Sequence, residues 1–163
     1  MREIKTAEIT DVVERLCIEA NEQLPEDIKG AIRRCRACED WETAQGVLDK
    51  IIENFEIAGE EHVPICQDTG VACVFLKIGQ DVHIEGMNLE DAVNEGIRQG
   101  YVEGYLRKSV VGDPLLRKNT EDNTPGIIHY EIVPGENIEI TVAPKGFGSE
   151  NMSRVYMLKP ADG

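Results

Sequence analysis

The 163-residue sequence contains no apolar run that approaches the roughly 20 residues needed to cross a bilayer. Its first residues, Met-Arg-Glu-Ile-Lys, lack the apolar core of a secretory signal peptide. Positive charge is also scarce, because 17 Lys and Arg stand against 31 Asp and Glu, for a formal net charge of -14. Nucleic acids and anionic membranes bind clustered cations, so neither is expected as a partner. We expect a cytoplasmic protein.

The sequence also lacks the cysteine pattern of a disulfide framework. Five cysteines, an odd number, in a chain with no predicted signal peptide favour reduced thiols. Cys35-Arg-Ala-Cys38 has C-x-x-C spacing, but no second pair completes a zinc site. On a helix, thiols at i and i+3 share a face for packing reasons alone, so we interpret the pair as structural. Redox work by this pair is an alternative, which redox-dependent disulfide formation would reveal.

Neither an internal repeat nor a low-complexity segment divides the chain, which has the length of about one domain with a sizeable core. Apolar residues at spacings of three and four predict a first helix over residues 6–21. A second helix is predicted to start at Pro25 and to bury Ile28, Ile32 and Cys35. A third follows Asp40 and ends near Gly59. We expect these three amphipathic helices to pack together.

The second half of the sequence predicts strands around one long helix. Residues 71–78 are almost continuously apolar, which favours a central strand covered on both faces, with residues 82–85 pairing back as a hairpin. Asn88 is predicted to cap a helix over residues 89–107. Two more strands are expected over residues 126–133 and 138–142, joined by a turn at Pro134-Gly135.

Gly96, Gly100 and Gly104 recur every fourth residue in the predicted long helix. Each glycine costs helix stability, but a glycine row lets a neighbouring backbone approach closely. The predicted fold is therefore α+β: N-terminal amphipathic helices, then a mostly antiparallel sheet with the long helix packed on it. We expect a single domain over residues 1–163.

Two loops carry the chemistry. The first places a thiol, an amide, a carboxylate and a hydroxyl on consecutive residues, Cys66-Gln67-Asp68-Thr69, and ends at Gly70. Unlike polar groups on such a loop seldom serve a core, although a well-bonded turn is the structural alternative. The second, residues 144–151 (Pro-Lys-Gly-Phe-Gly-Ser-Glu-Asn), is rich in glycine and can form a nest of backbone N–H groups around a carboxylate or phosphate. It fits neither a P-loop nor a dinucleotide fingerprint.

Together, C-Q-D-T-G over residues 66–70 and A-P-K-G-F-G-S-E-N over residues 143–151 resemble the class I, iron–sulfur-dependent fumarate hydratases and L-tartrate dehydratases. The intervening L-R-K-S (106–109) and K-N-T…N-T-P (118–125) fit the same family in the same order. The resemblance extends over essentially the whole chain and is to the N-terminal part of the alpha subunit in the two-subunit form.

The resemblance implies a hydro-lyase that hydrates fumarate reversibly to malate through a [4Fe-4S] cluster with one open iron. It implies that Cys66 binds the cluster and that Asp68 protonates or orients the leaving hydroxyl. It places Gln67 near a small C4 dicarboxylate substrate and Arg107 on a substrate carboxylate. Gly146 and Gly148 are expected at a substrate-carboxylate contact of the glycine loop. L-tartrate dehydratase is the alternative within the family, and a non-catalytic binding or assembly module is the alternative of a different class.

The chain departs from the family in its thiols. Such a cluster needs three thiolates, and only Cys66 matches a family ligand. We therefore expect the sequence to be an N-terminal fragment of a longer alpha subunit, with two further ligand cysteines elsewhere. Alone it should be clusterless and inactive. The expected partners are the beta subunit or domain, which would carry the C–H base, and further copies in a homo-oligomer of the assembled enzyme.

Overall fold

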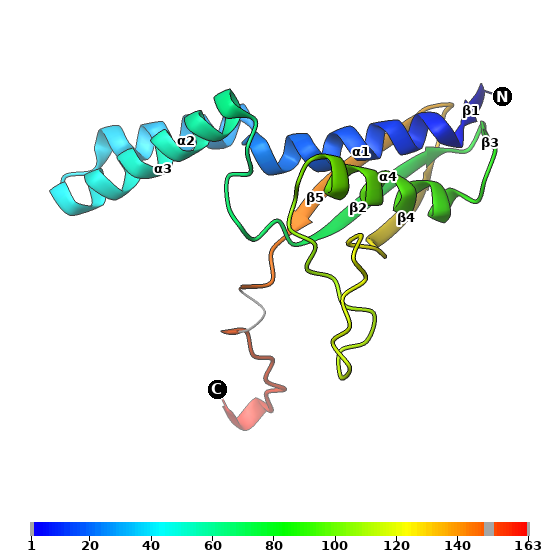
Figure 1. Cartoon of the computed structure of the whole chain (residues 1–163). Coiled ribbons are helices and arrows are strands. Elements are labelled where there is room, and N and C mark those ends of the chain that lie inside the picture. The colour runs from blue at the N-terminus through cyan, green and yellow to red at the C-terminus, as the bar shows by residue number, and fades with distance from the viewer. Residues whose placement is uncertain (1, 149–151, 163) are drawn as a thin grey trace.

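The structure is a computed structural model that describes residues 2–148 and 152–162 (Figure 1). Its helices and strands confirm the α+β class. In chain order they are β1 Arg2–Lys5, α1 Thr6–Glu22, α2 Glu26–Cys38, α3 Glu42–Glu61, β2 Val71–Gly79, β3 Val82–Glu85, α4 Leu89–Glu103, β4 Ile127–Val133, β5 Ile138–Lys145 and a 3-10 turn at Pro160–Asp162. None of the described helices is long and apolar enough to span a bilayer.

The main sheet has the order β4-β2-β5, with β2 parallel to β4 and antiparallel to β5. The short strands β1 and β3 form a separate parallel pair. The predicted mostly antiparallel sheet is therefore wrong, because two of the three strand pairings in the described residues are parallel. The parallel pairing of β2 with β4 follows from helix α4, because this helix lies between the two strands in the chain and returns it to the end of the sheet where β2 began.

The predicted hairpin between residues 71–78 and 82–85 is also wrong. After β2 the chain turns so that the N–H of Gln80 donates to the carbonyl of Val133, and β3 pairs with β1 instead. The turn after β4 passes the end of β2, where Gly79 N–H donates to the carbonyl of Asn137 at 2.8 Å. This path places β4 and β5 on opposite edges of β2 rather than next to each other.

Helices α1 and α4 lie side by side over one face of the main sheet (Figure 1). The glycine row is confirmed as their contact, because a Cβ on Gly96 would lie 2.6 Å from the carbonyl oxygen of Thr10. A Cβ on Gly100 would lie 2.8 Å from Cys17 Cβ. The core beneath this contact consists of Ile4, Ile9, Val13, Cys17, Ala72, Val74, Leu76, Val93, Ile97, Tyr101 and Leu106.

Helix α4 starts as predicted and ends early. The side chain of Asn88 accepts hydrogen bonds from Glu90 N–H and Asp91 N–H, which confirms the N-cap. The helix stops at Glu103 instead of residue 107, because Gly104 caps it and Tyr105 takes a left-handed backbone with φ 52°. Residues 104–126 therefore form one long loop.

The other face of β2 is open. Val74 and Leu76 point into the core, whereas Phe75 is 43% exposed and stacks on His129 at 4.9 Å between ring centroids. The prediction that β2 is covered on both faces is thus wrong for the described residues. The strand has a core-facing side and a more exposed side, as period-two alternation gives.

Helices α2 and α3 form a hairpin that extends away from the sheet, here called the arm (Figure 1). The predicted packing of three N-terminal helices is wrong, because α1 packs mainly on α4. No residue of α2 is buried, so Ile28, Ile32 and Cys35 do not form the expected buried face. In α3 the buried residues are Phe55 and Ala58.

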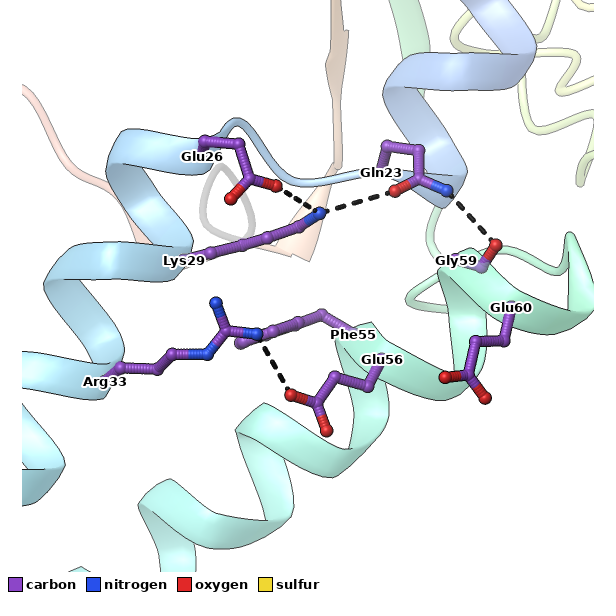
Figure 2. A pocket seen from close by; sticks show the side chains of 8 residues that line it. All are labelled: Gln23, Glu26, Lys29, Arg33, Phe55, Glu56, Gly59 and Glu60. Atoms are coloured by element: carbon purple, nitrogen blue, oxygen red, sulfur yellow. Dashed lines mark hydrogen bonds and ion pairs between the residues drawn. The ribbon is translucent and has the colours of Figure 1, made fainter.

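A cavity of about 250 Å³ lies between α2 and α3 at the base of the arm, next to the end of α1 (Figure 2). Its cations are already paired, with Lys29 bound to Glu26 at 2.9 Å and Arg33 to Glu56 at 3.0 Å. The guanidinium of Arg33 also lies over the Phe55 ring, 5.3 Å from its centroid. With carboxylates already in place, this cavity offers no free cation to an anionic ligand, and we interpret it as a structural joint.

Candidate active site

The two loops singled out by their chemistry meet at one end of β2. Strand β2 begins directly after Gly70, and β5 ends at Lys145, which is paired with Val71. Because β5 is antiparallel to β2, the loop that enters β2 and the loop that leaves β5 must lie together. The contact is direct, since the N–H of Phe147 donates to Asp68 Oδ2 at 3.0 Å. Residues 149–151 of the second loop lie outside the described residues.

Glycine is required on both sides of this contact. Gly70 has φ +64°, and a Cβ there would lie 2.1 Å from the carbonyl oxygen of Lys145. A Cβ on Gly146 would lie 2.8 Å from Asp68 Oδ2, and one on Gly148 would lie 4.0 Å from the same atom. Gly146 and Gly148 therefore border the Asp68 carboxylate, and their contact with a substrate stays a prediction.

Cys66 is exposed and lies among polar groups of its own loop. Its thiol donates to Gln67 Oε1 at 3.4 Å and accepts from the N–H of Asp68 at 3.5 Å. A concavity of about 400 Å³ beside it is lined by Pro64, Cys66, Gln67, Thr69, Tyr105 and Arg107. The structure thus brings Arg107, which follows α4, to the same hollow as Cys66 and Gln67.

Arg107 has a fixed backbone and an exposed side chain. The hydroxyl of Thr69 donates to the carbonyl oxygen of Arg107 at 3.1 Å, and Leu106 before it is buried. No carboxylate pairs with the Arg107 guanidinium within the residues that the structure describes. An unpaired guanidinium beside a hollow can take a carboxylate with two parallel hydrogen bonds.

Two supporting residues were given no role from the sequence, although Asn123 stands in the N-T-P motif. The hydroxyl of Tyr101, buried on α4, donates to the carbonyl oxygen of Thr69 at 2.8 Å. Burial raises the pKa of this phenol, which keeps it neutral and able to donate. The position of Tyr101 on the apolar face of the predicted helix indicates only that it is a core residue. Asn123 lies fully buried in the long loop and bonds to the segments on both sides of the hollow. That loop has no periodicity from which its burial could be inferred.

The thiols of this chain do not make a cluster site by themselves. Among the described residues no group of three or more His, Cys, Asp or Glu side chains is placed to hold a metal ion. Cys17 is buried in the core, Cys73 lies on β2, and Cys35 and Cys38 lie on the arm. Only Cys66 lies at the hollow, so this chain fits one ligand of the three that a [4Fe-4S] cluster with an open iron requires.

Comparison with known proteins gives this site a family. A family model described as "Fumarate hydratase (Fumerase)" matches residues 10–163. The chain belongs to this fumarate hydratase family. It is 45% identical over 161 residues to a protein of Methanocaldococcus jannaschii named "Putative L(+)-tartrate dehydratase subunit alpha". The matched residues cover 95% of this chain and 56% of that protein.

Other similar proteins are named either as fumarate hydratases or as tartrate dehydratases. A "Putative fumarate hydratase class I" of Geobacillus stearothermophilus is 30% identical over 148 residues, covering 88% of this chain and 28% of that protein. The "L(+)-tartrate dehydratase subunit alpha" of Escherichia coli K12 is 23% identical over 159 residues, covering 95% of this chain and 52% of that protein. The chain spans about half or less of the length of these relatives.

Proposed function

We propose that this chain is the N-terminal part of the alpha subunit of a hydro-lyase that adds water to, or removes it from, a small C4 dicarboxylate. The observation that carries the proposal is the convergence of the Cys66–Asp68 segment, the Gly146–Gly148 segment and Arg107 at one end of β2. This convergence occurs in a chain of the fumarate hydratase family, whose relatives are named as fumarate hydratases and tartrate dehydratases.

Arg107 and Gln67 would bind the substrate. A guanidinium holds a carboxylate through a rigid two-pronged set of donors, and the exposed Arg107 beside the hollow meets this requirement. Gln67 lines the same hollow and offers an amide that can donate or accept. The glycine loop would contact the second carboxylate through its backbone at Gly146 or Gly148.

Asp68 would be the acid. Its carboxyl group is held by the N–H of Phe147, which fixes where its proton is delivered. In dehydration, a base outside this chain takes the C–H proton and the adjacent C–O bond breaks. The hydroxyl then leaves as water with the proton of Asp68. In hydration Asp68 takes that proton from water.

Cys66 would hold one iron of a [4Fe-4S] cluster, with the two other thiolates supplied from outside this chain. When bound, such a cluster supplies a Lewis acid for substrate oxygens. The exposed thiol of Cys66 at the hollow supports this role. The word "alpha" in the names of the relatives supports a beta subunit as partner, and we propose a homo-oligomer of the assembled enzyme.

Fumarate and malate are the proposed substrate pair, and L(+)-tartrate is the second candidate because the 45% identical relative carries the tartrate name. The test is to purify the chain anaerobically with its natural remainder and beta subunit, and to assay malate and tartrate side by side. We expect water elimination from one of them. An assembled protein without iron and without turnover of either substrate would instead favour the binding or assembly module.

Single variants of that assembly test the assigned residues. Cys66→Ala should lose bound iron, whereas Cys38→Ala, on the exposed arm, should keep it. Normal iron content in Cys66→Ala would refute the ligand assignment. Arg107→Ala should raise KM by roughly 10- to 100-fold, the loss expected for a charge-assisted contact. Arg34→Ala on α2 is the control, and an unchanged KM in Arg107→Ala would refute the binding role.

A further inference from the structure

The side chain of Asn123 is completely buried, with 0% exposure, in a loop that is otherwise largely polar. A buried amide is costly unless its donors and acceptor are bonded. Here both ends are used. Its Nδ2 donates to the carbonyl oxygen of Gly70 at 3.0 Å, and its Oδ1 accepts from the N–H groups of Ser109 at 2.8 Å and Val110 at 3.1 Å.

These bonds join two separate parts of the site. Gly70 ends the loop that carries Cys66 and Asp68, whereas Ser109 and Val110 directly follow the segment that carries Arg107. One side chain therefore connects the backbone on both sides of the hollow. The hydroxyl of Thr69, on the carbonyl oxygen of Arg107, and the side-chain amide of Asn119, on the carbonyl oxygen of Lys108, also hold the second segment. The hydroxyl of Ser109 is buried without a partner among the described residues.

Asparagine suits this position for two reasons. It offers a donor and an acceptor at opposite sides of one planar group, which matches a carbonyl on one side and two amides on the other. Its backbone is also left-handed, with φ 62°, a region that Asn enters more readily than most residues. Aspartate would keep the acceptor but would turn an oxygen toward the carbonyl of Gly70.

We propose that Asn123 is a positioning residue that fixes the Arg107 segment relative to the Cys66–Asp68 loop, so that dicarboxylate affinity depends on it. It acts through Arg107 and has no contact with substrate. The inference rests on the proposed function. Its physical basis is that catalytic and binding groups lose most of their effect when displaced by about 1 Å. Residues 104–126 have no helix that could hold Arg107 by itself.

The experiment compares Asn123→Asp with wild type in the assembled enzyme, using malate and L-tartrate as probes. We expect KM to rise on the order of tenfold, the change that losing one hydrogen bond of about 1.4 kcal/mol produces. Iron content should stay at the wild-type level. Hydrogen exchange should accelerate in residues 66–70 and 106–112, while β2 and α4 keep their protection.

Asn137→Asp is the matched control, because Asn137 lies in the turn at the opposite end of the sheet, where its side chain bonds Arg2. It should leave KM and both exchange segments unchanged. Equal KM and equal local exchange in Asn123→Asp and wild type would overturn the proposal. So would a general loss of protection through α1 and α4, which would indicate a merely structural role.

A failure of the proposed function gives a different result. A wild-type assembly that binds neither dicarboxylate overturns that function and, with it, the effect of Asn123 on affinity. The exchange comparison still decides whether Asn123 joins the two loops. If Asn123→Asp does not fold, Asn123→Ser, which is smaller and carries no charge, is measured in the same way. Wild-type KM and wild-type exchange at both segments in Asn123→Ser would overturn the proposal.

Discussion

The body of this protein, made of α1, α4 and the main sheet, and its α2–α3 arm have similar helical patterns and very different burial. In the body, Val13 and Ile97 are fully buried where α1 meets α4. On the arm, Trp41 is 67% exposed and Val47 57% exposed. The difference in burial follows from what each helix packs against. The glycine row of α4 lets α1 approach closely, whereas α2 and α3 pack mainly against each other.

The two regions still cooperate at the site. The loop that carries Cys66 leaves the arm at His62 and is tied to the body by Ile65, whose N–H donates to the carbonyl of Asn21 at 2.9 Å. The side chain of Asn54 on α3 donates to the carbonyl of Ile65 at 3.0 Å. The loop that carries Cys66 is therefore held by both regions. The arm thus contributes to the site although few of its residues are buried.

Thiol reactivity should separate the two regions most strongly. Burial raises the pKa of the Cys17 thiol from 9.0 to about 12. At pH 8 its alkylation should thus be about a thousandfold slower than that of a thiol at the ordinary pKa. Cys35 and Cys38 on the arm are exposed and should react readily. Iodoacetamide pulses followed by peptide mass spectrometry measure the rates, and equal labelling of Cys17 and Cys38 would remove the distinction.

Truncation of an apolar side chain should have the next largest effect. Leu76→Ala, in the sheet core, should lower the free energy of unfolding by about 2–5 kcal/mol because it leaves a cavity. Ile51→Ala, on the arm, removes a side chain that is already 41% exposed, and it should cost less than about 1 kcal/mol. Urea unfolding of the two variants gives the comparison. A similar loss in both would mean that the arm is buried in solution.

Glycine replacement should act in opposite directions in the two regions. Gly96→Ala forces a methyl group against Thr10 and should destabilise the protein by about 1–3 kcal/mol. Gly46→Ala on α3 meets nothing within 4 Å, so its better helix propensity should stabilise the arm by up to about 1 kcal/mol. Thermal or urea unfolding checks the sign. Destabilisation by Gly46→Ala would point to a close neighbour on that helix.

The smallest effect is expected from the ion pair between Arg36 and Asp49, which joins α2 to α3 at 2.6 Å. Both groups are in contact with water, so solvent and salt screen their attraction. Arg36→Gln should shift the urea midpoint only slightly at low salt and not measurably at high salt. A shift that persists at high salt would show that this pair is shielded.

Sequence reasoning succeeded where the signal is local. The cap at Asn88 and the close approach at Gly96 follow from a side chain or its absence at a given helical position, and the structure confirms both. The position of Cys66 just before a strand was also predicted correctly, although that strand is buried on one face rather than on both. The reasoning failed for strand pairing and for the arm, because a period says which face is apolar and not what covers it.

The sequence by itself determined the chemistry of this protein: which residues carry a thiol, a carboxylate and a guanidinium, and the family in which that order of motifs occurs. Only the tertiary structure decided that β5 returns beside β2, which brings Phe147 to Asp68. It likewise decided that Asn123 joins the loops of Gly70 and Arg107. The physical reason is distance along the chain, since such contacts depend on how the whole chain packs rather than on any local pattern.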